Sequence, residues 1–177
     1  TIPVIKRLVE IKKSLVISID TTKREVARQA LDSGTSIVND ISGLTSDEKM
    51  IDVVKSYNAG IIIMHIKGNP KTMQENPNYI DVVNEVKDFL SQQSYKAKQN
   101  GIDKIIIDPG IGFGKRVEDN FELIKRLEKF QSIGFPVMIG LSRKSFLGKI
   151  LDLNVNDRDI PTVIMETASV LKSARII

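Results

Sequence analysis

The stretch KIIIDPGIGFGK, residues 104–115, combines a branched apolar run with a polar residue and a glycine-rich loop. The run at 105–107 is typical of a strand buried on both faces, as in a parallel sheet. The run ends at Asp108, and Pro109 prevents the strand from continuing. Three alternating glycines around Phe113 then allow backbone to approach a ligand closely. Ligands of barrels and open α/β sheets bind at the carboxyl ends of such strands, so this stretch predicts a binding site.

Length and composition predict an ordinary globular protein. The 177 residues are enough for a substantial core, and we expect a single domain over residues 1–177. Hydrophobic residues make up 41% and charged residues 27%. The absence of cysteine excludes disulfides, thiolate zinc sites and a cysteine nucleophile. His65 is the only histidine, which excludes a metal cluster built on several histidines.

The charge pattern favours small molecules over macromolecules as partners. The net charge is +4, the lysines are spread over helical segments, and aromatic residues are only 5%. We therefore expect no nucleic-acid partner, although a modest attraction for a small anionic substrate fits this charge. No apolar run approaches the length of a membrane span. Lys6, Arg7, Lys12 and Lys13 interrupt the amino end, so we expect no secretory signal, no membrane and a cytoplasmic location.

Strand-like and helical segments alternate along the chain, as expected of βα units. Thr22, with Glu25 in the capping-box position, predicts the start of one helix. Apolar stripes predict further helices around 82–90, around 121–130 before Gly134 and Pro136, and over 161–173. The strand-like runs are 15–19, 36–38, 61–64, 105–107, 137–139 and a stub at 174–177.

The ends of these strands favour a barrel over a doubly wound open sheet. A ring of polar groups from many strand ends is typical of a (β/α) barrel, whereas open sheets concentrate them at one switch point. An eight-unit barrel takes about 250 residues, and about six of its eight units are visible here. We therefore predict an α/β fold of the (β/α)8 TIM-barrel type that lacks its first two units and its end. The polar residues are Asp20, Asn39, Met64 with His65, Asp108, and Ser142 to Lys144.

Five segments resemble the motifs of a known family. They are SIDT at 18–21, VNDISG at 38–43, MHIKGNPKTMQENPNY at 64–79, DPGIGFGK at 108–115 and GLSRKSFLG at 140–148. Their order and approximate spacing resemble dihydropteroate synthase from the first residues to the last. The SRKSF and MHxxGxPxTMQ patterns distinguish this synthase from the pterin-binding methyltransferases, which share its barrel.

The resemblance implies a transferase of folate biosynthesis and a target of sulfonamides. The family condenses 6-hydroxymethyl-7,8-dihydropterin pyrophosphate with p-aminobenzoate to give 7,8-dihydropteroate and pyrophosphate. It implies Mg²⁺ as the cofactor, and it implies no metal ligand within residues 1–177. It also implies a homodimer through late barrel helices, for which an apolar face is available at Ile160, Val163, Ile164 and Val170.

The pterin contacts implied by the resemblance fit the residue chemistry. A pterin carries an N3–H beside a 2-amino group, and the carboxylate of Asp108 suits such an edge because it accepts two parallel hydrogen bonds. Asn39 offers both a donor and an acceptor to ring nitrogens. Lys144 matches the lysine near the pterin carbonyl, which makes Lys144 and Asp108 the implied catalytic residues. The remaining implied pterin contacts are Asp20, Ile41, Met64 and Gly112. We expect Asp20, Asn39, Asp108 and Lys144 to meet at one mouth.

The implied p-aminobenzoate contacts are Phe113, Lys144 and Ser145. Phe113 is expected to pack against the ring. Ser142 or Arg143 is expected to begin a helix whose first amides, with Ser145, bind the carboxylate. The family chemistry is dissociative, so few acid–base groups are needed beyond those that stabilise the leaving charge and exclude water.

Parts of the family pattern have no match between Thr1 and Ile177, namely the early loops and the late arginine and histidine that hold pyrophosphate. We therefore expect this stretch to retain part of the pterin pocket and to be a poor catalyst. Asp40 is interpreted as structural, His65 as a packing residue and Lys115 as a weak phosphate candidate. Three alternatives remain open: a pterin-binding methyltransferase subunit, a degenerate non-catalytic barrel and, last, a sugar-phosphate barrel enzyme.

Overall fold

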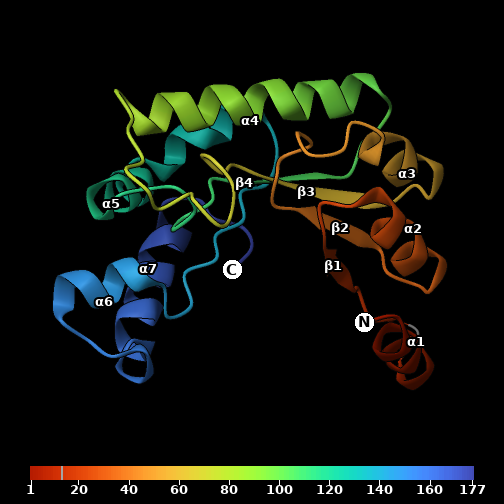
Figure 1. Cartoon of the computed structure of the whole chain (residues 1–177), viewed down its shortest axis with the longest axis horizontal. Coiled ribbons are helices and arrows are strands. Elements are labelled where there is room, and N and C mark those ends of the chain that lie inside the picture. Colours follow the sequence, from red (N-terminus) through yellow and green to blue (C-terminus); the bar gives the residue numbers. More distant parts are fainter. Residues whose placement is uncertain (13) are drawn as a thin grey trace. The chain divides into compact units, whose positions relative to one another are not determined.

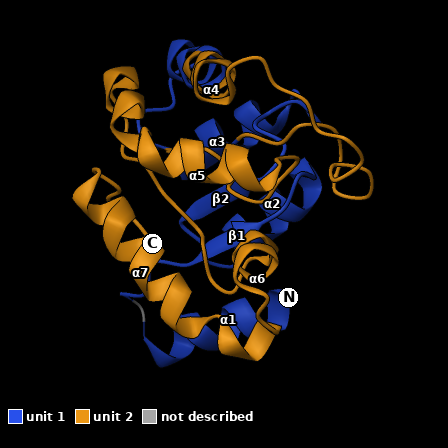
Figure 2. Cartoon of the chain, turned by 90° about the vertical axis from the view of Figure 1, so that its left-hand side faces the viewer, with its two compact units in different colours: residues 1–64, 92–106 blue, residues 65–91, 107–177 orange. Residues whose placement is uncertain are grey.

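The computed structural model describes residues 1–12 and 14–177, so Lys13, one of the four basic residues of the amino end, lies outside it. The chain forms two compact units, which Figure 2 distinguishes by colour. Unit 1 consists of Thr1–Met64 and Gln92–Ile106, and unit 2 consists of His65–Ser91 and Ile107–Ile177. Within the described part of the chain, no helix is long and apolar enough to span a membrane.

Unit 1 is built from βα units on a parallel sheet (Figure 1). The strand order is β1-β2-β3-β4, and the last strand, β4 (Ile105–Asp108), begins in this unit. Strand β1 pairs with β2 in parallel, and β2 pairs with β3 in the same way. The amide of Ile61 donates to the carbonyl of Lys104 at 2.9 Å. The other elements are α1 (Ile2–Ile11), β1 (Ser18–Asp20), α2 (Arg24–Asp32), β2 (Ile37–Asp40), α3 (Met50–Ser56) and β3 (Gly60–Met64).

The core of unit 1 follows from the branched runs of the sequence. All five residues of β3 are buried, as expected of a strand covered on both faces. Helices α2 and α3 contact each other and bury one apolar stripe each, which in α2 contains Ala27, Ala30 and Leu31. Small alanines on this stripe let the helix approach its neighbours closely.

Unit 2 is dominated by helices. Helix α4 (Val82–Gln99) belongs to it as far as Ser91, followed by α5 (Val117–Lys125), the 3₁₀ helix η1 (Leu127–Ile133), α6 (Ser145–Leu151), η2 (Val155–Asp157) and α7 (Asp159–Leu171). Helix α5 contacts both α6 and α7. The rings of Phe121 and Phe146 meet edge-on, with their centroids 5.2 Å apart. Parallel backbone bridges join Ile107 to Val137 and Met138 to Ile176.

The structure corrects two predictions near the start of the chain. The first strand is 18–20 instead of 15–19, because Leu15 and Val16 have no core to pack against, and Val16 is 72% exposed. Helix α2 is not capped by Thr22, since its N-cap residue is Lys23 and no side chain caps it. Glu25 instead binds Arg28 within the same helix, with 2.7 Å between Oε1 and Nη2.

Three predictions in unit 2 need smaller corrections. The helix expected around 121–130 is divided into α5 and η1, and it ends at Gly134, which has the left-handed φ of 90° typical of a helix C-terminus. The strand expected at 137–139 and the stub at 174–177 are reduced to single bridges. The helix that begins within the SRKSF motif starts at Ser145, with Lys144 as N-cap, instead of at Ser142 or Arg143. Arg143 takes a positive φ of 50°, which a helix does not allow.

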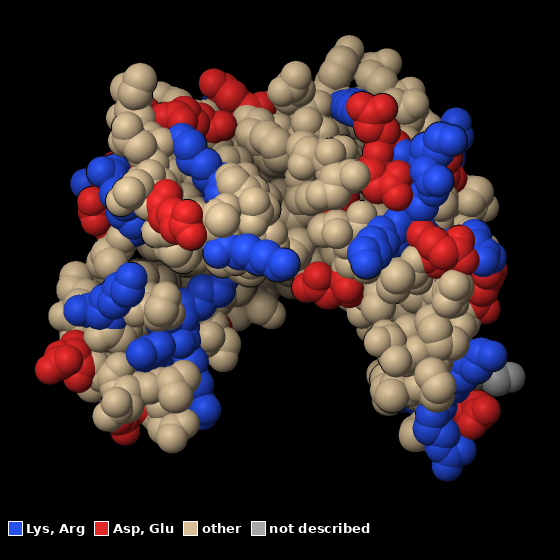
Figure 3. Space-filling view, in the orientation of Figure 1, with Lys and Arg blue, Asp and Glu red and all other residues tan. Residues whose placement is uncertain are grey.

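Charged side chains of both signs are mixed over the face shown in Figure 3. Within helix α2, Arg28 pairs with Asp32 at 2.9 Å. Exposed pairs of this kind contribute little to stability. The mixture of signs on this face agrees with the spread of lysines over helical segments in the sequence.

Candidate functional site

In unit 1, Asp20 and Asn39 lie side by side at the carboxyl ends of β1 and β2, where they are register partners. The Asn39 Nδ2 donates to Asp20 Oδ2 at 3.4 Å. The other amide atom, Asn39 Oδ1, is buried and has no hydrogen-bond partner within the described residues. Burial, and then the charge of Asp40, raises the pKa of Asp20. A buried acceptor without a donor costs free energy, so Asn39 offers a ready contact to a ligand N–H.

Asp40 has the structural role predicted for it. Its side chain is fully buried and accepts hydrogen bonds from the amide and hydroxyl of Ser42, at 2.9 and 2.6 Å, and from the amide of Leu44 at 3.1 Å. These bonds shape the turn that follows β2. Ile41 in this turn is half-buried, and Met64 is buried at the end of β3.

In unit 2, Asp108 ends β4 as a buried carboxylate. Its Oδ1 accepts from the amide of Gly110 at 2.7 Å, and its carbonyl accepts from the amide of His65 at 3.0 Å. Among the described residues, no ion pair within 4 Å neutralises Asp108. Burial raises its pKa, which the Gly110 amide and the charges of Lys144 and Lys115 oppose. A buried acidic group in this state is poised for a ligand that donates hydrogen bonds.

The residues that follow, 110–114, are called here the glycine loop. Gly110, Gly112 and Gly114 have φ values of 69°, 83° and 63°, a region that other residues rarely adopt. Close approach requires glycine as well. A Cβ on Gly112 would lie 2.9 Å from Lys144 Cδ, and a Cβ on Gly114 would meet the carbonyl of Lys67. The glycines therefore allow other groups to reach the loop backbone.

Four consecutive carbonyls of the glycine loop each accept a hydrogen bond from a different side chain. Gln74 Nε2 donates to Gly112 O at 2.6 Å, and Tyr79 Oη donates to Gly114 O at 2.7 Å. The lysines at 144 and 115 donate to Ile111 O and to Phe113 O. Asn120 holds the loop from α5, since its Oδ1 accepts from the Gly112 amide. The conformation of the loop is thus set by side chains from several segments of unit 2.

Sequence reasoning missed three of these partners, Gln74, Tyr79 and Asn120. Gln74 and Tyr79 belong to the MHIKGNPKTMQENPNY motif, so their position in a specific motif was the available signal. Asn120 is almost completely buried on a helix, where asparagine is otherwise unfavourable.

Lys144 is the N-cap residue of α6 and extends to the glycine loop. Its ammonium group also lies over the ring of Phe113. Burial lowers the pKa of Lys144, and the carboxylate of Asp108 opposes this effect. The structure therefore brings together four of the five predicted site residues of unit 2, namely Asp108, Gly112, Phe113 and Lys144.

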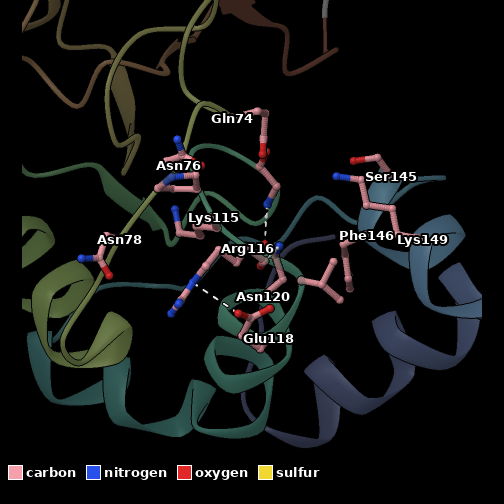
Figure 4. A pocket seen from close by; sticks show the side chains of 13 residues that line it. Gln74, Asn76, Asn78, Lys115, Arg116, Glu118, Asn120, Ser145, Phe146 and Lys149 are labelled. Atoms are coloured by element: carbon pink, nitrogen blue, oxygen red, sulfur yellow. Dashed lines mark hydrogen bonds and ion pairs between the residues drawn. The ribbon is translucent and has the colours of Figure 1, made fainter.

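A cavity of about 680 Å³ adjoins the glycine loop within unit 2 (Figure 4). Ser145, the fifth predicted residue of this unit, lies on its wall together with Gly112 and Phe146. Three cationic side chains, Lys115, Arg116 and Lys149, and one carboxylate, that of Glu118, also line it. This wall is suited to an anionic group on a ligand that also has an apolar part.

The nine predicted site residues are divided between the units. Unit 1 holds Asp20, Asn39, Ile41 and Met64, and unit 2 holds Asp108, Gly112, Phe113, Lys144 and Ser145. Their convergence at one mouth stays a prediction. His65 is buried between aromatic rings, as predicted, whereas Lys115 is a buried side chain that bonds to the loop and is poorly suited to the weak phosphate contact considered for it.

Comparison with known proteins identifies the family. The sequence profile of the pterin-binding enzymes matches residues 1–177. The dihydropteroate synthase of Synechocystis is 48% identical over 154 residues, which cover 86% of this chain and 53% of that protein. The chain thus spans about half the length of this relative.

Two solved structures extend the likeness to the fold. The dihydropteroate synthase of Thermus thermophilus, in complex with 4-aminobenzoate, superposes with a TM-score of 0.93 at 35% identity, over 99% of this chain and 71% of that one. That of Xanthomonas albilineans, in complex with 7,8-dihydropteroate, gives 0.90 at 35% identity, over 99% and 64%. The predicted fold, an incomplete (β/α)8 barrel, is confirmed. The chain belongs to the pterin-binding enzyme family.

Proposed function

We propose that this chain acts as the pterin-binding part of a dihydropteroate synthase, a cytoplasmic transferase of folate biosynthesis. It condenses 6-hydroxymethyl-7,8-dihydropterin pyrophosphate with p-aminobenzoate, giving 7,8-dihydropteroate and pyrophosphate. The proposal rests above all on Asp108, a buried carboxylate without an ionic partner within the described residues, beside a loop that carries two further predicted contacts. The related synthases support it, since their solved complexes contain 4-aminobenzoate and 7,8-dihydropteroate.

We assign pterin binding to side chains whose hydrogen bonds within the protein leave a donor or an acceptor for the ligand. The Oδ1 of Asp108 accepts from the protein, and no hydrogen bond from the described residues to its Oδ2 competes with a ligand. The N3–H and 2-amino group of a pterin supply the donors that a carboxylate binds in pairs. Lys144, a donor beside the loop, is assigned to the pterin carbonyl. In unit 1, the unpartnered Oδ1 of Asn39 supports a pterin contact for that residue, and we keep Asp20, Ile41 and Met64 as further contacts.

The second substrate is assigned to Phe113, Lys144 and Ser145. Ser145 lies on the cavity wall with Lys149, and this cation favours the carboxylate of p-aminobenzoate. Phe113 offers an aromatic face to its ring. In the reaction the bond between the pterin methylene and pyrophosphate breaks, the amine nitrogen bonds to that methylene, and the amine loses a proton. The chain's contribution is to bind and orient the two rings and to exclude water.

The family resemblance implies Mg²⁺, which supplies charge stabilisation to a departing pyrophosphate when bound. The described residues contain no group of three or more histidine, aspartate or glutamate side chains that could hold a metal ion. We therefore assign no residue of this chain to the metal. We also propose a homodimer through α7, where the apolar side chains of Ile160, Val163, Ile164 and Val170 are exposed.

The function is tested with a polypeptide in which this chain is extended to the length of its relatives. Release of pyrophosphate from the dihydropterin substrate is measured with and without p-aminobenzoate. We expect release that depends on both substrates and a loss of roughly 100-fold in kcat/KM for Asp108→Asn, the effect of losing a buried charge-assisted hydrogen bond.

The matched control is Asp103→Asn, an exposed carboxylate that pairs with Lys98. We expect it to leave the rate unchanged. Pterin binding without any use of p-aminobenzoate would instead favour a methyl-transfer subunit. A folded protein that binds neither compound would favour a non-catalytic barrel.

A further inference from the structure

Within the described residues, Lys115 is a buried lysine that bonds only to neutral acceptors. Its side chain is almost completely enclosed, with 3% of the residue exposed. The Nζ lies 3.0 Å from the carbonyl oxygen of Phe113, 3.0 Å from Nδ1 of His65 and 3.4 Å from the carbonyl oxygen of His65. An ammonium group has three protons, so each acceptor takes one. No ion pair within 4 Å is formed by Lys115 among the described residues.

His65 is a rigidly packed hydrogen-bond partner of this lysine. Its ring is buried, meets the ring of Phe89 edge-on with centroids 5.1 Å apart, and lies 6.2 Å from that of Tyr79. Burial, and then the charges of Lys115 and Lys67, lowers the pKa of His65 to about 3. The imidazole is therefore neutral near pH 7, and in the tautomer with its proton on Nε2 the Nδ1 atom accepts a proton from the charged lysine.

Phe113 depends on this arrangement because its carbonyl is not one of those that Gln74, Tyr79 and Lys144 bind. It lies between Gly112 and Gly114, whose backbone has the widest conformational freedom. Its amide bonds within the loop, to the carbonyl of Gly110 at 3.0 Å. Its carbonyl bonds to Lys115, so the orientation of the following peptide is fixed from the His65 side.

We propose that Lys115 is a positioning residue that, supported by His65, fixes the glycine loop and so the orientation of the Phe113 ring. The inference rests on the proposed function in one respect, namely that Phe113 receives the aromatic ring of p-aminobenzoate. The loop geometry itself is independent of any ligand.

The charge of Lys115 makes the positioning sensitive to pH. Burial lowers the pKa of Lys115 to about 7, and the charges of Lys144 and Lys67 also act to lower it. The carboxylates of Asp108 and Asp119 oppose them. His65, the remaining titratable group in contact, stays neutral across this range. Above pH 7 the amine retains two protons for three acceptors, so one hydrogen bond is lost and the loop loosens.

The absence of tryptophan allows a direct test on the chain as it stands. Phe113→Trp places a single indole in the glycine loop, and its emission and anisotropy report the order of that position as the pH is raised from acidic to alkaline. We expect a loss of order with a midpoint near pH 7. When Phe113→Trp is combined with Lys115→Arg, whose guanidinium stays charged, the indole is expected to remain ordered over the whole pH range. When it is combined with Lys115→Met, the indole is expected to be disordered at every pH.

The matched control is the double variant of Phe113→Trp with Lys125→Met, because the Lys125 side chain is 74% exposed on α5. This double variant should lose order at the same midpoint pH as Phe113→Trp by itself. If the Lys115→Arg protein keeps that midpoint, another group titrates and the proposal is wrong. If Lys115→Met does not fold by circular dichroism, the arginine variant decides the matter alone.

The reporter needs no substrate, so the two proposals fail separately. A pH-dependent indole, together with a wild-type protein that binds no p-aminobenzoate, would contradict the proposed function and leave the positioning role intact. Binding of p-aminobenzoate with a pH-independent indole would contradict the positioning role alone.

Discussion

The ammonium nitrogen of Lys144 lies 4.5 Å from the centroid of the Phe113 ring. The same nitrogen donates to the carbonyl of Ile111, so one lysine contacts both the backbone and the aromatic side chain of the glycine loop. Cation–π contacts of this kind strengthen as they lose solvent, and Lys144 is half-buried. The contact couples the residue assigned to the pterin with the residue assigned to p-aminobenzoate.

Gly112 is predicted to contribute to pterin affinity because the Lys144 side chain packs closely against it. Gly112→Ala places a Cβ 2.9 Å from Lys144 Cδ and also imposes a φ of 83° on alanine. Gly134→Ala is the matched control, since it has a φ of 90° and no heavy atom within 4 Å of the added Cβ. Both changes should lower the free energy of unfolding by about 1 kcal/mol. Only Gly112→Ala should also weaken binding of a pterin analogue, by about 10-fold. Calorimetric titration of the two variants checks this, and equal affinities would disprove it.

His65 is predicted to make stability fall in acid. The unfolded imidazole binds a proton near pH 6.5, whereas in the folded chain its pKa is lowered to about 3. Between these values the unfolded state holds one more proton, so the free energy of unfolding decreases as the pH falls, by about 1 kcal/mol per pH unit. The variant His65→Asn keeps an acceptor near Nδ1 and does not titrate. Urea unfolding at several pH values should show the extra slope in the wild type alone, and parallel curves would contradict the burial of His65.

Tyr79 is predicted to stabilise the glycine loop through its hydroxyl group. Tyr79→Phe removes the donor to Gly114 O and leaves a carbonyl unsatisfied, which should cost about 1–2 kcal/mol of unfolding free energy. Tyr95→Phe provides the control, because Tyr95 is 66% exposed and should change stability by less than about 0.5 kcal/mol. Denaturant unfolding of both variants gives the comparison. A Tyr79→Phe protein as stable as Tyr95→Phe would show that the loop does not depend on this bond.

The sequence predicted the strands β2, β3 and β4 and their polar ends, because both follow from local pattern. The run before Asp108 is branched and continuous, so a buried strand ending in a carboxylate was the simplest interpretation. The interpretation of 15–19 as a strand failed because apolar residues alone do not show whether a partner covers them. Thr22 failed as a cap because Thr21 forms the local turn instead, its Oγ1 accepting from the amide of Lys23.

The support of the glycine loop was beyond prediction from pattern. Gln74 and Gly112 are 38 residues apart in sequence, and Lys115 reaches back 50 residues to His65. No local periodicity reports such contacts, and the lysine in particular reads as a surface residue or a phosphate ligand. Its burial is visible only once the chain is folded. The candidate site was therefore predicted as a set of groups, while what holds them in place came from the structure.

Calorimetric titration of this chain and of its Asp108→Asn variant with a 2-amino-4-oxo pterin is the most direct test of the account. The buried carboxylate of Asp108 predicts binding by the wild type and a loss of roughly 100-fold or more in the variant, with an unchanged circular dichroism spectrum. A variant that folds and binds the pterin as tightly as the wild type would contradict the assignment of this carboxylate to the pterin edge.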